Sequence, residues 1–112
     1  MELVTHKKLY LVSGRISRPL AESIAAEMGE SLGEPNLSEF SNGEIHCRFS
    51  ESIRGCDAFI IQTHCHGPGT SINDALMEQL IMVDAARRAS AKRITVVCPH
   101  YGYARQDRKS SG

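Results

Sequence analysis

The chain has 112 residues, with 13 Lys and Arg against 13 Asp and Glu, so its formal net charge is zero. A hydrophobic share of 41% and a charged share of 23% are typical of one globular domain and argue against disorder. A neutral chain with no Trp lacks the basic surface and stacking rings of a general nucleic-acid binder. No apolar run approaches the roughly 18 residues of a membrane span, and the start lacks a secretory signal pattern.

The cysteines indicate a reducing environment. Cys47, Cys56, Cys65 and Cys98 form no C-x-x-C pair and are spaced too widely for a zinc ribbon. Because three of them lie in or beside apolar, strand-like runs, we expect reduced thiols in a cytoplasmic protein rather than disulfides. The triplet His64–His66 could place two imidazoles on one face, but no third ligand is visible, so we expect a His-rich loop without a metal.

The chain begins with a predicted strand and a predicted helix. Lys8–Gly14 is a short apolar run that ends in Gly, which is typical of a buried strand. Pro19–Met28 predicts a helix, because Pro19 suits a first turn and Gly29 or Gly33 can end it. Its apolar residues recur every four positions and would stack on one face: Leu20, Ile24 and Met28.

A β-hairpin is predicted next. Asn36–Ser41 and Glu44–Phe49 are extended runs separated by Asn42-Gly43, the strongest short hairpin signal, because both residues tolerate positive φ. In the second run, apolar and polar residues alternate, as expected for a strand that is buried on one face. The apolar positions are Ile45, Cys47 and Phe49.

Two further runs read as buried strands. Asp57–Thr63 is apolar without alternation, which fits a strand that is covered on both faces. Arg93–Cys98 is rich in β-branched residues and is stopped by Pro99. The intervening residues His64–Thr70 contain Gly67-Pro68-Gly69 and predict a loop.

A long helix is predicted from Ser71 or Asn73 to Ala89, with Ser71 and Asp74 at capping-box spacing. One apolar face contains Ile72, Ala75, Leu76, Met82, Val83 and Ala86. A second apolar group lies largely on the other side, and consists of Met77, Leu80 and Ile81. A helix that covers one sheet needs one apolar stripe, so the second group packs either on further sequence of the same chain or on another subunit.

The order strand, helix, hairpin, strand, helix, strand predicts an α/β fold with three layers. We expect a mostly parallel sheet with helices on both faces and a local antiparallel hairpin. A doubly wound sheet usually continues with a helix after such a strand, so we expect residues 1–112 to form an incomplete subunit.

Two segments have side chains suited to ligand binding. Phe40–Glu44 is either a hairpin with good turn chemistry or a site where a ring, an amide and a carboxylate hold a flat heteroaromatic ligand. Pro99–Lys109 leaves the carboxyl end of a buried strand, where open α/β sheets bind ligands. Its arginines could hold phosphate oxygens, or it could be a solvated basic loop. Neither a P-loop nor a G-x-G-x-x-G motif is present.

The motifs taken together resemble the amino-terminal domain of ribose-phosphate pyrophosphokinase. They occur in the family's order and spread over most of the chain from Lys8 onward. The matching segments are Phe40–Glu44, Glu51–Gly55, Asp57–Gln62, Leu76–Ala85 and Tyr103–Arg108. The pair of Phe-Ser-Asn-Gly-Glu and Tyr-Ala-Arg-Gln-Asp-Arg is the most specific part of this resemblance.

The resemblance implies a phosphoribosyltransferase-like fold and an activity. The family transfers the diphosphoryl group of ATP to the C1 hydroxyl of ribose 5-phosphate, needs Mg²⁺, and assembles into dimers and hexamers. Carried over by position, Phe40, Asn42, Gly43 and Glu44 would hold the adenine end of ATP, partly across a subunit boundary. Arg105, Gln106 and Asp107 would hold ATP from the other side.

The resemblance also places limits on this chain. The family's metal-binding His, its catalytic Lys/Arg loop and its ribose-5-phosphate loop lie downstream of the present residues. We therefore expect no catalytic residue and no metal ligand in residues 1–112, and no diphosphoryl transfer by these residues alone. The link from His64 to Asp74 looks a little longer than the family's. A non-catalytic regulatory or scaffolding relative is the alternative, and a generic α/β binding domain is disfavoured by five ordered motifs.

Overall fold

The computed structural model describes residues 8–66, 69–100, 102 and 103. Every strand and helix expected from the sequence is present in the expected order. The elements are β1 (Leu9–Ser13), α1 (Arg18–Met28), β2 (Asn36–Glu39), β3 (Ile45–Arg48), β4 (Asp57–Ile61), α2 (Ile72–Arg88) and β5 (Arg93–Val97). The mixed α/β class is thus confirmed, with bounds that differ from the prediction by a few residues.

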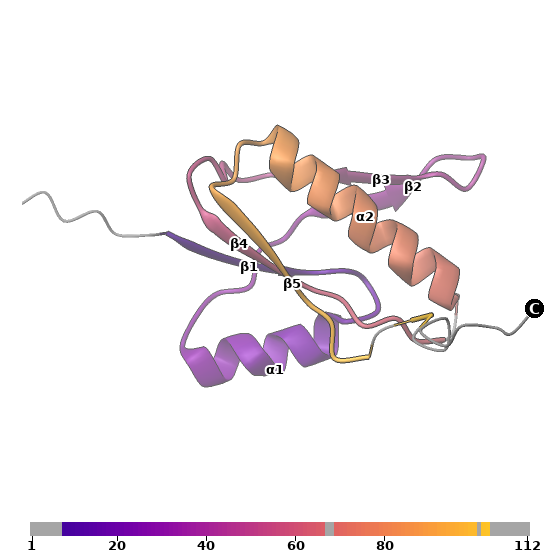
Figure 1. Cartoon of the computed structure of the whole chain (residues 1–112), viewed down its shortest axis with the longest axis horizontal. Helices are drawn as coiled ribbons and strands as arrows, with labels where there is room; N and C mark the ends of the chain where they lie inside the picture. The colour runs from indigo at the N-terminus through magenta and orange to yellow at the C-terminus, as the bar shows by residue number, and fades with distance from the viewer. Residues whose placement is uncertain (1–7, 67–68, 101, 104–112) are drawn as a thin grey trace, which may run out of the picture.

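The strands form one parallel sheet and one hairpin. The parallel sheet has the order β1-β4-β5, so β4 is central, and the antiparallel pair β2-β3 is separate from it. In the register of the sheet, Tyr10 lies opposite Ala58, which lies opposite Ile94. Because the three strands are parallel, their last residues, Ser13, Ile61 and Val97, lie opposite one another at the carboxyl edge of the sheet. The strands run from left to right in Figure 1.

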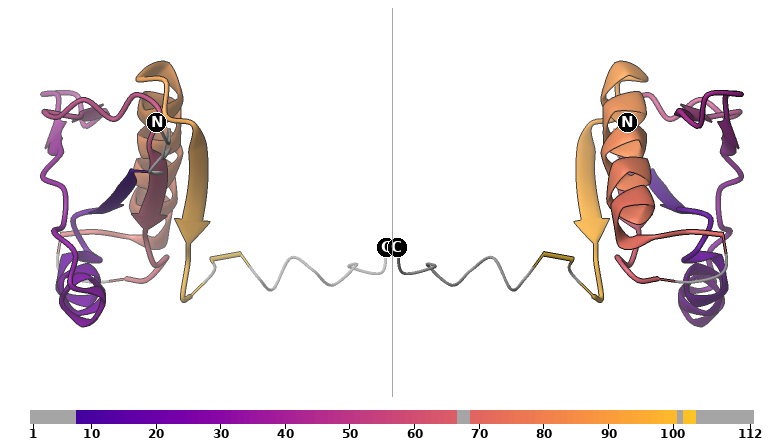
Figure 2. Two further views of the ribbon diagram at one scale, coloured as in Figure 1. Left: turned by 90° about the vertical axis from the view of Figure 1, so that its left-hand side faces the viewer. Right: turned by 90° about the vertical axis from the view of Figure 1, so that its right-hand side faces the viewer.

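The sheet is covered on both faces, as predicted. Helix α1 lies on one side, whereas α2 and the hairpin lie together on the other (Figures 1 and 2). The core is on the side of α2, and its buried residues are Tyr10, Val12, Ile53, Cys56, Ala58, Ile60, Met82 and Ala86. Leu11 is also buried but outside this cluster, because its side chain alternates to the face that α1 covers.

The buried face of α1 differs from the prediction. Ala21 and Ala25 are the buried residues of this helix, whereas Leu20 and Met28 are 40% and 52% exposed and Ile24 is half-buried. The short Ala side chains allow α1 to approach β1 closely, so the longer residues point outward. The ends of the helix agree with the prediction: Pro lies in the first turn, and Gly29 closes the helix with φ of 68°.

Strand β5 is also less buried than predicted. Ile94 and Val96 are half-buried, whereas Arg93, Thr95 and Val97 are exposed. The reason is its position, because β5 lies at the edge of the sheet and pairs only with β4 among the described residues (Figure 2). A run of β-branched residues predicts a strand, but it does not distinguish a central strand from an edge strand.

Helix α2 begins as the capping-box spacing predicts. The hydroxyl of Ser71 accepts a hydrogen bond of 3.1 Å from the backbone N–H of Asp74. The buried line along the helix is Ala75, Glu78, Met82 and Ala86. Ile72, predicted to belong to the buried face, is 38% exposed, while Met77 and Leu80 of the second apolar group are 51% and 50% exposed.

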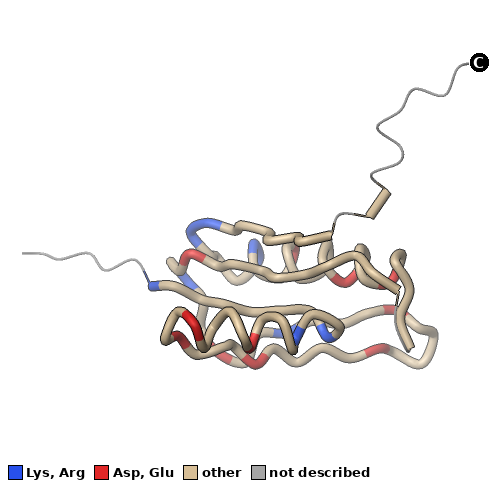
Figure 3. Tube along the Cα trace, turned by 90° about the horizontal axis from the view of Figure 1, so that it is seen from below, with Lys and Arg blue, Asp and Glu red and all other residues tan. Residues whose placement is uncertain are grey.

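The described surface carries charges of both signs. Seen from the side of α1, acidic and basic residues are mixed along the tube rather than gathered on one stripe (Figure 3). Neither helix among the described residues has the length and apolar character needed to cross a bilayer. Cys47, Cys56, Cys65 and Cys98 are free thiols, as predicted, and burial raises the pKa of Cys47 to about 11.

Candidate functional site

The carboxyl edge of the parallel sheet is held rigid by hydrogen bonds between the segments that leave the strands. The Gly14 N–H donates to the Ile61 carbonyl at 3.2 Å, and the Gln62 N–H donates to the Val97 carbonyl at 3.0 Å. Beyond the strand ends, the His64 N–H donates to the His100 carbonyl at 2.9 Å. This is the edge at which open α/β sheets bind their ligands.

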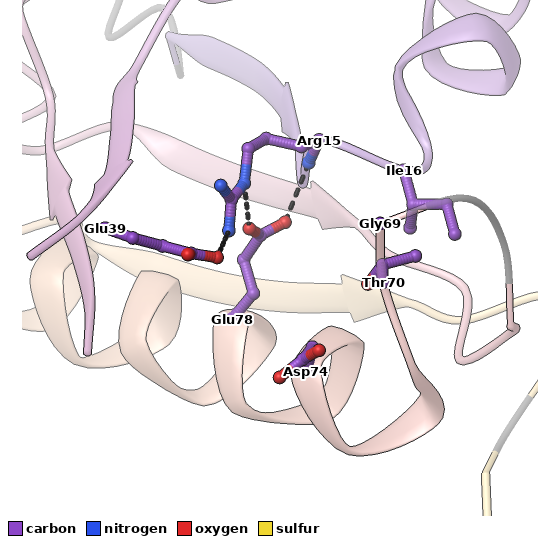
Figure 4. A pocket seen from close by; sticks show the side chains of 7 residues that line it. All are labelled: Arg15, Ile16, Glu39, Gly69, Thr70, Asp74 and Glu78. Atoms are coloured by element: carbon purple, nitrogen blue, oxygen red, sulfur yellow. Dashed lines mark hydrogen bonds and ion pairs between the residues drawn. The ribbon is translucent and has the colours of Figure 1, made fainter. Parts of the chain in front are cut away.

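A cavity of about 260 Å³ opens at this edge, beside the segment that follows β1. It is lined by Arg15, Ile16, Glu39, Gly69, Thr70, Asp74 and Glu78 (Figure 4). Arg15 lies between two carboxylates: its Nε donates to Glu78 Oε2 at 2.6 Å, and its terminal nitrogen donates to Glu39 Oε1 at 3.3 Å. Partial burial disfavours the charged guanidinium, but these two partners outweigh it and raise the pKa of Arg15.

Glu78 belongs to a buried polar network behind this cavity. Its Oε1 accepts from the Arg15 backbone N–H at 2.7 Å and from Gln62 Nε2 at 3.2 Å. Gln62 also donates to the Ala75 carbonyl at 3.0 Å and accepts from the Ser17 hydroxyl at 2.9 Å. A Cβ on Gly14 would lie 2.1 Å from Gln62 Oε1, so a side chain at this position would displace the Gln62 amide from its hydrogen bonds.

The hairpin turn brings together the first group of predicted site residues. Phe40, Asn42, Gly43 and Glu44 are all exposed, and the turn projects toward the carboxyl edge of the sheet (Figure 1). Asn42 Oδ1 accepts from the Glu44 N–H at 3.1 Å, and its amide donates to the Glu44 carboxylate. The Phe40 ring is 55% exposed, with its centroid 5.3 Å from that of His46. A ring, an amide and a carboxylate are therefore presented together.

The turn itself differs from the predicted geometry. Gly43 has φ of 90°, but Asn42 does not adopt a positive φ. The Phe40 N–H donates to the Glu44 carbonyl at 2.7 Å, and the Gly43 N–H donates to the Phe40 carbonyl at 2.8 Å. This pattern is a three-residue loop with glycine in the left-handed position, rather than a two-residue turn with both residues at positive φ.

The second predicted group, Arg105, Gln106 and Asp107, lies outside the described residues. The chain is described as far as Tyr103, whose hydroxyl donates to Asn73 Oδ1 at the start of α2. The segment after β5 thus runs to the amino end of α2. That the arginine segment and the hairpin turn hold ATP from two sides therefore stays a prediction.

In the described part of the His-rich loop, the two histidines lie in different environments. Across residues 8–66, 69–100, 102 and 103, no three His, Cys, Asp or Glu side chains converge as ligands. His64 is fully buried, whereas His66 is exposed, so the two rings do not form a pair of ligands on one face.

Arg15, Gln62 and Glu78 were not singled out from the sequence. The spacing of Glu78 along α2 is a signal that it is buried. It lies three residues after Ala75 and four before Met82, on the apolar face of the helix. A charged residue on a buried stripe indicates a charged or hydrogen-bonding partner elsewhere in the fold. That partner, Arg15, is 63 residues away in sequence, so no local pattern reveals it.

Similarity to known proteins extends over nearly the whole chain. Residues 9–112 match the family described as the N-terminal domain of ribose phosphate pyrophosphokinase. The chain is 54% identical over 106 residues to a ribose-phosphate pyrophosphokinase of Mycobacterium leprae, with 95% of this chain and 31% of that protein covered. It is 50% identical over 108 residues to the chloroplastic ribose-phosphate pyrophosphokinase 1 of Arabidopsis thaliana, covering 96% of this chain and 26% of that protein.

Solved structures agree with this similarity. The phosphoribosylpyrophosphate synthetase of Mycobacterium smegmatis superposes with a TM-score of 0.84 at 50% identity, covering 92% of this chain and 33% of that one. A purine phosphoribosyltransferase of Pyrococcus horikoshii superposes with a TM-score of 0.52 at 12% identity, covering 82% and 60%, which shows likeness of fold alone. The chain spans between a quarter and a third of the pyrophosphokinases it matches. The chain therefore belongs to the family of ribose-phosphate pyrophosphokinase amino-terminal domains.

Proposed function

We propose that the full-length protein carrying this chain transfers the diphosphoryl group of ATP to the C1 hydroxyl of ribose 5-phosphate. The products are phosphoribosyl pyrophosphate and AMP. The observation that carries the proposal is the family match over residues 9–112, together with identities near 50% to ribose-phosphate pyrophosphokinases. The intact hairpin and arginine motifs also support an enzyme rather than a scaffold, which would need neither.

The hairpin turn is proposed to bind the adenine end of ATP. The exposed Phe40 ring stacks on the base, while Asn42 and Glu44 offer an amide and a carboxylate to its edge. Gly43 keeps the turn tight, because only glycine adopts its φ of 90° without strain. Since the turn is exposed, a neighbouring subunit can complete the site across a boundary.

Arg105, Gln106 and Asp107 are proposed to bind ATP from the other side. In the reaction, the C1 hydroxyl oxygen attacks the β-phosphorus of ATP and loses its proton. The bond from that phosphorus to the oxygen bridging to the α-phosphate breaks, and AMP leaves with the electron pair. Such a transfer depends on neutralised charge and aligned oxygens more than on covalent work by the protein, and a guanidinium at Arg105 supplies charge.

Mg²⁺ is proposed to enter with ATP, bound to its phosphate oxygens. Among the described residues no three ligands converge, and two carboxylates of the cavity, Glu39 and Glu78, are already paired with Arg15. These residues therefore do not fit a magnesium site.

Arg105→Ala in the full-length protein tests the proposal. We expect the turnover number for phosphoribosyl pyrophosphate to fall about 100-fold or more, because one charged donor to the transition state is lost. The measurement is a coupled assay with ATP, Mg²⁺ and ribose 5-phosphate. Lys92→Ala, an exposed position beyond α2, is the control and should leave turnover unchanged.

Two results would contradict the proposal. Unchanged turnover in Arg105→Ala would remove that residue from the site. A full-length protein that makes no product, yet associates with an active relative and alters its rate, would instead indicate the regulatory or scaffolding alternative.

A further inference from the structure

His64 is a fully buried titratable side chain, three residues after the end of β4, that the proposed site does not use. It lies at the carboxyl edge of the sheet, and its backbone N–H donates to the His100 carbonyl at 2.9 Å. Its imidazole contacts two further elements, the segment after β5 and helix α2. A buried imidazole with contacts on both sides fixes the relative position of those elements.

The hydrogen bonds of the imidazole define its tautomer. The backbone N–H of Gly102 donates to His64 Nδ1 at 2.9 Å, so Nδ1 is an acceptor and carries no proton. In a neutral ring the proton then lies on Nε2, which faces the side-chain oxygen of Gln79. His64 therefore accepts from the segment after β5 and donates to α2, and neither role can be exchanged without turning the ring.

Close packing at Gly102 supports the same contact independently. A Cβ on Gly102 would lie 3.0 Å from His64 Cβ and 3.0 Å from Ile72 Cγ2, so the backbone sits directly against both side chains. The next residue, Tyr103, has φ of 64°, an uncommon backbone conformation for a residue with a side chain. Its hydroxyl donates to Asn73 Oδ1, which ties the segment to α2 a second time.

We propose that His64 is a positioning residue, which fixes the segment after β5 against α2 through Gly102 and so supports ATP binding by the residues that follow Gly102 in sequence. Arg105 follows Gly102 by three residues, which span at most about 10 Å. The contact at Gly102 is therefore close in sequence to the residues proposed to bind ATP. The proposal rests on the proposed function, since it assigns His64 to ATP binding by way of Arg105.

Two substitutions separate the roles of the ring nitrogens. Asn places its side-chain oxygen near the position of Nδ1, so His64→Asn keeps the acceptor for the Gly102 N–H and loses the donor to Gln79. Gln places its nitrogen near the position of Nε2, so His64→Gln keeps the donor and loses the acceptor. Both variants keep a neutral polar side chain at the same buried position, so each is the matched control for the other.

The experiment is steady-state kinetics of the full-length protein with each variant. We expect His64→Gln to raise the KM for ATP about tenfold, because the buried Gly102 N–H loses its acceptor. His64→Asn should keep this KM within about twofold, and both variants should keep the KM for ribose 5-phosphate within about twofold. Equal KM values for ATP, a larger rise in His64→Asn, or parallel rises for both substrates would overturn the proposal.

Hydrogen exchange at the Gly102 amide separates this proposal from the proposed function. In the full-length protein, we expect about tenfold faster exchange of this amide in His64→Gln than in His64→Asn. A wild-type protein that forms no phosphoribosyl pyrophosphate would refute the proposed function, and with it the link to ATP. The difference in exchange would still establish that His64 holds Gly102 through a hydrogen bond. Equal exchange in both variants would refute the role of His64 in holding Gly102, whatever the activity.

Discussion

Glu78 shows how a single charged residue organises the carboxyl edge of the sheet. Its side chain is 5% exposed, and a carboxylate taken so far out of water is costly unless its oxygens are bonded. Here both oxygens are bonded, by the backbone and side chain of Arg15 and by Gln62. Because Arg15 also reaches Glu39, the last residue of β2, the same guanidinium ties the strand that leads into the hairpin turn to α2.

Removing the guanidinium should leave the buried carboxylate partly uncompensated. We expect Arg15→Met in the full-length protein to lower the free energy of unfolding by about 2 kcal/mol, a value reduced because Arg15 is 44% exposed. Adding Glu78→Gln should restore part of the loss, because the charge is then gone. Chemical unfolding of the single and double variants measures this, and a double variant less stable than Arg15→Met would contradict it.

A matched control lies on α1. Arg18 also bonds to two carboxylates, Glu22 and Glu34, but both of these carboxylate side chains are exposed, unlike Glu78. Arg18→Met should therefore destabilise the protein less than Arg15→Met does. If the two variants lose the same stability, the burial of Glu78 does not govern the strength of the pair.

At the scale of elements, hydrophobic periodicity and the residues that begin and end helices predict which segments are helices and strands. The predicted helix ends lie within a few residues of the observed ones, because they rest on proline at the start of α1, Gly29 at its end and Ser71 before α2. The same patterns did not predict which face of α1 is buried or that β5 is an edge strand. Both depend on which other elements are present nearby, and a single sequence window contains no such information.

Helix α2 exposes apolar side chains that point to a contact with another subunit. Met77 and Leu80 expose half of their surface on this helix, and we propose that this face contacts a second subunit. Met77→Glu should then shift the full-length protein toward smaller species in sedimentation velocity, because a charge cannot be buried unpaired. Ala26→Glu introduces the same residue at an exposed position of α1 and should not change the distribution. Unaltered sedimentation of Met77→Glu would argue against the interface.

At the scale of the whole molecule, the sequence predicts one half of the candidate site better than the other. The hairpin residues lie within five consecutive positions, so their proximity follows from a local turn signal. The cavity residues come from the segment after β1, the end of β2 and the start of α2, and their meeting depends on the tertiary fold. Residues 105–107 lie outside the described part, so their place in the site rests on resemblance.

The 112 residues by themselves are expected to be inactive. They span 31% of one pyrophosphokinase relative and 26% of another, so they correspond to less than a third of the length of either protein. A sensitive assay of this polypeptide with ATP, Mg²⁺ and ribose 5-phosphate should detect no phosphoribosyl pyrophosphate, while the full-length protein at equal molar concentration forms it. Product from the isolated polypeptide would show that the groups needed for transfer lie within it.

The position of β5 at the edge of the sheet affects the tendency of the isolated polypeptide to self-associate. Its outer side presents backbone donors and acceptors that no other described residue pairs with, whereas the outer side of β1 is partly covered through a bridge from Leu11 to Leu32. An unprotected strand of this kind is a template for intermolecular β-pairing, and its Thr and Val side chains favour that pairing. We expect the isolated polypeptide to self-associate through this strand as its concentration rises, unless a covering segment is supplied.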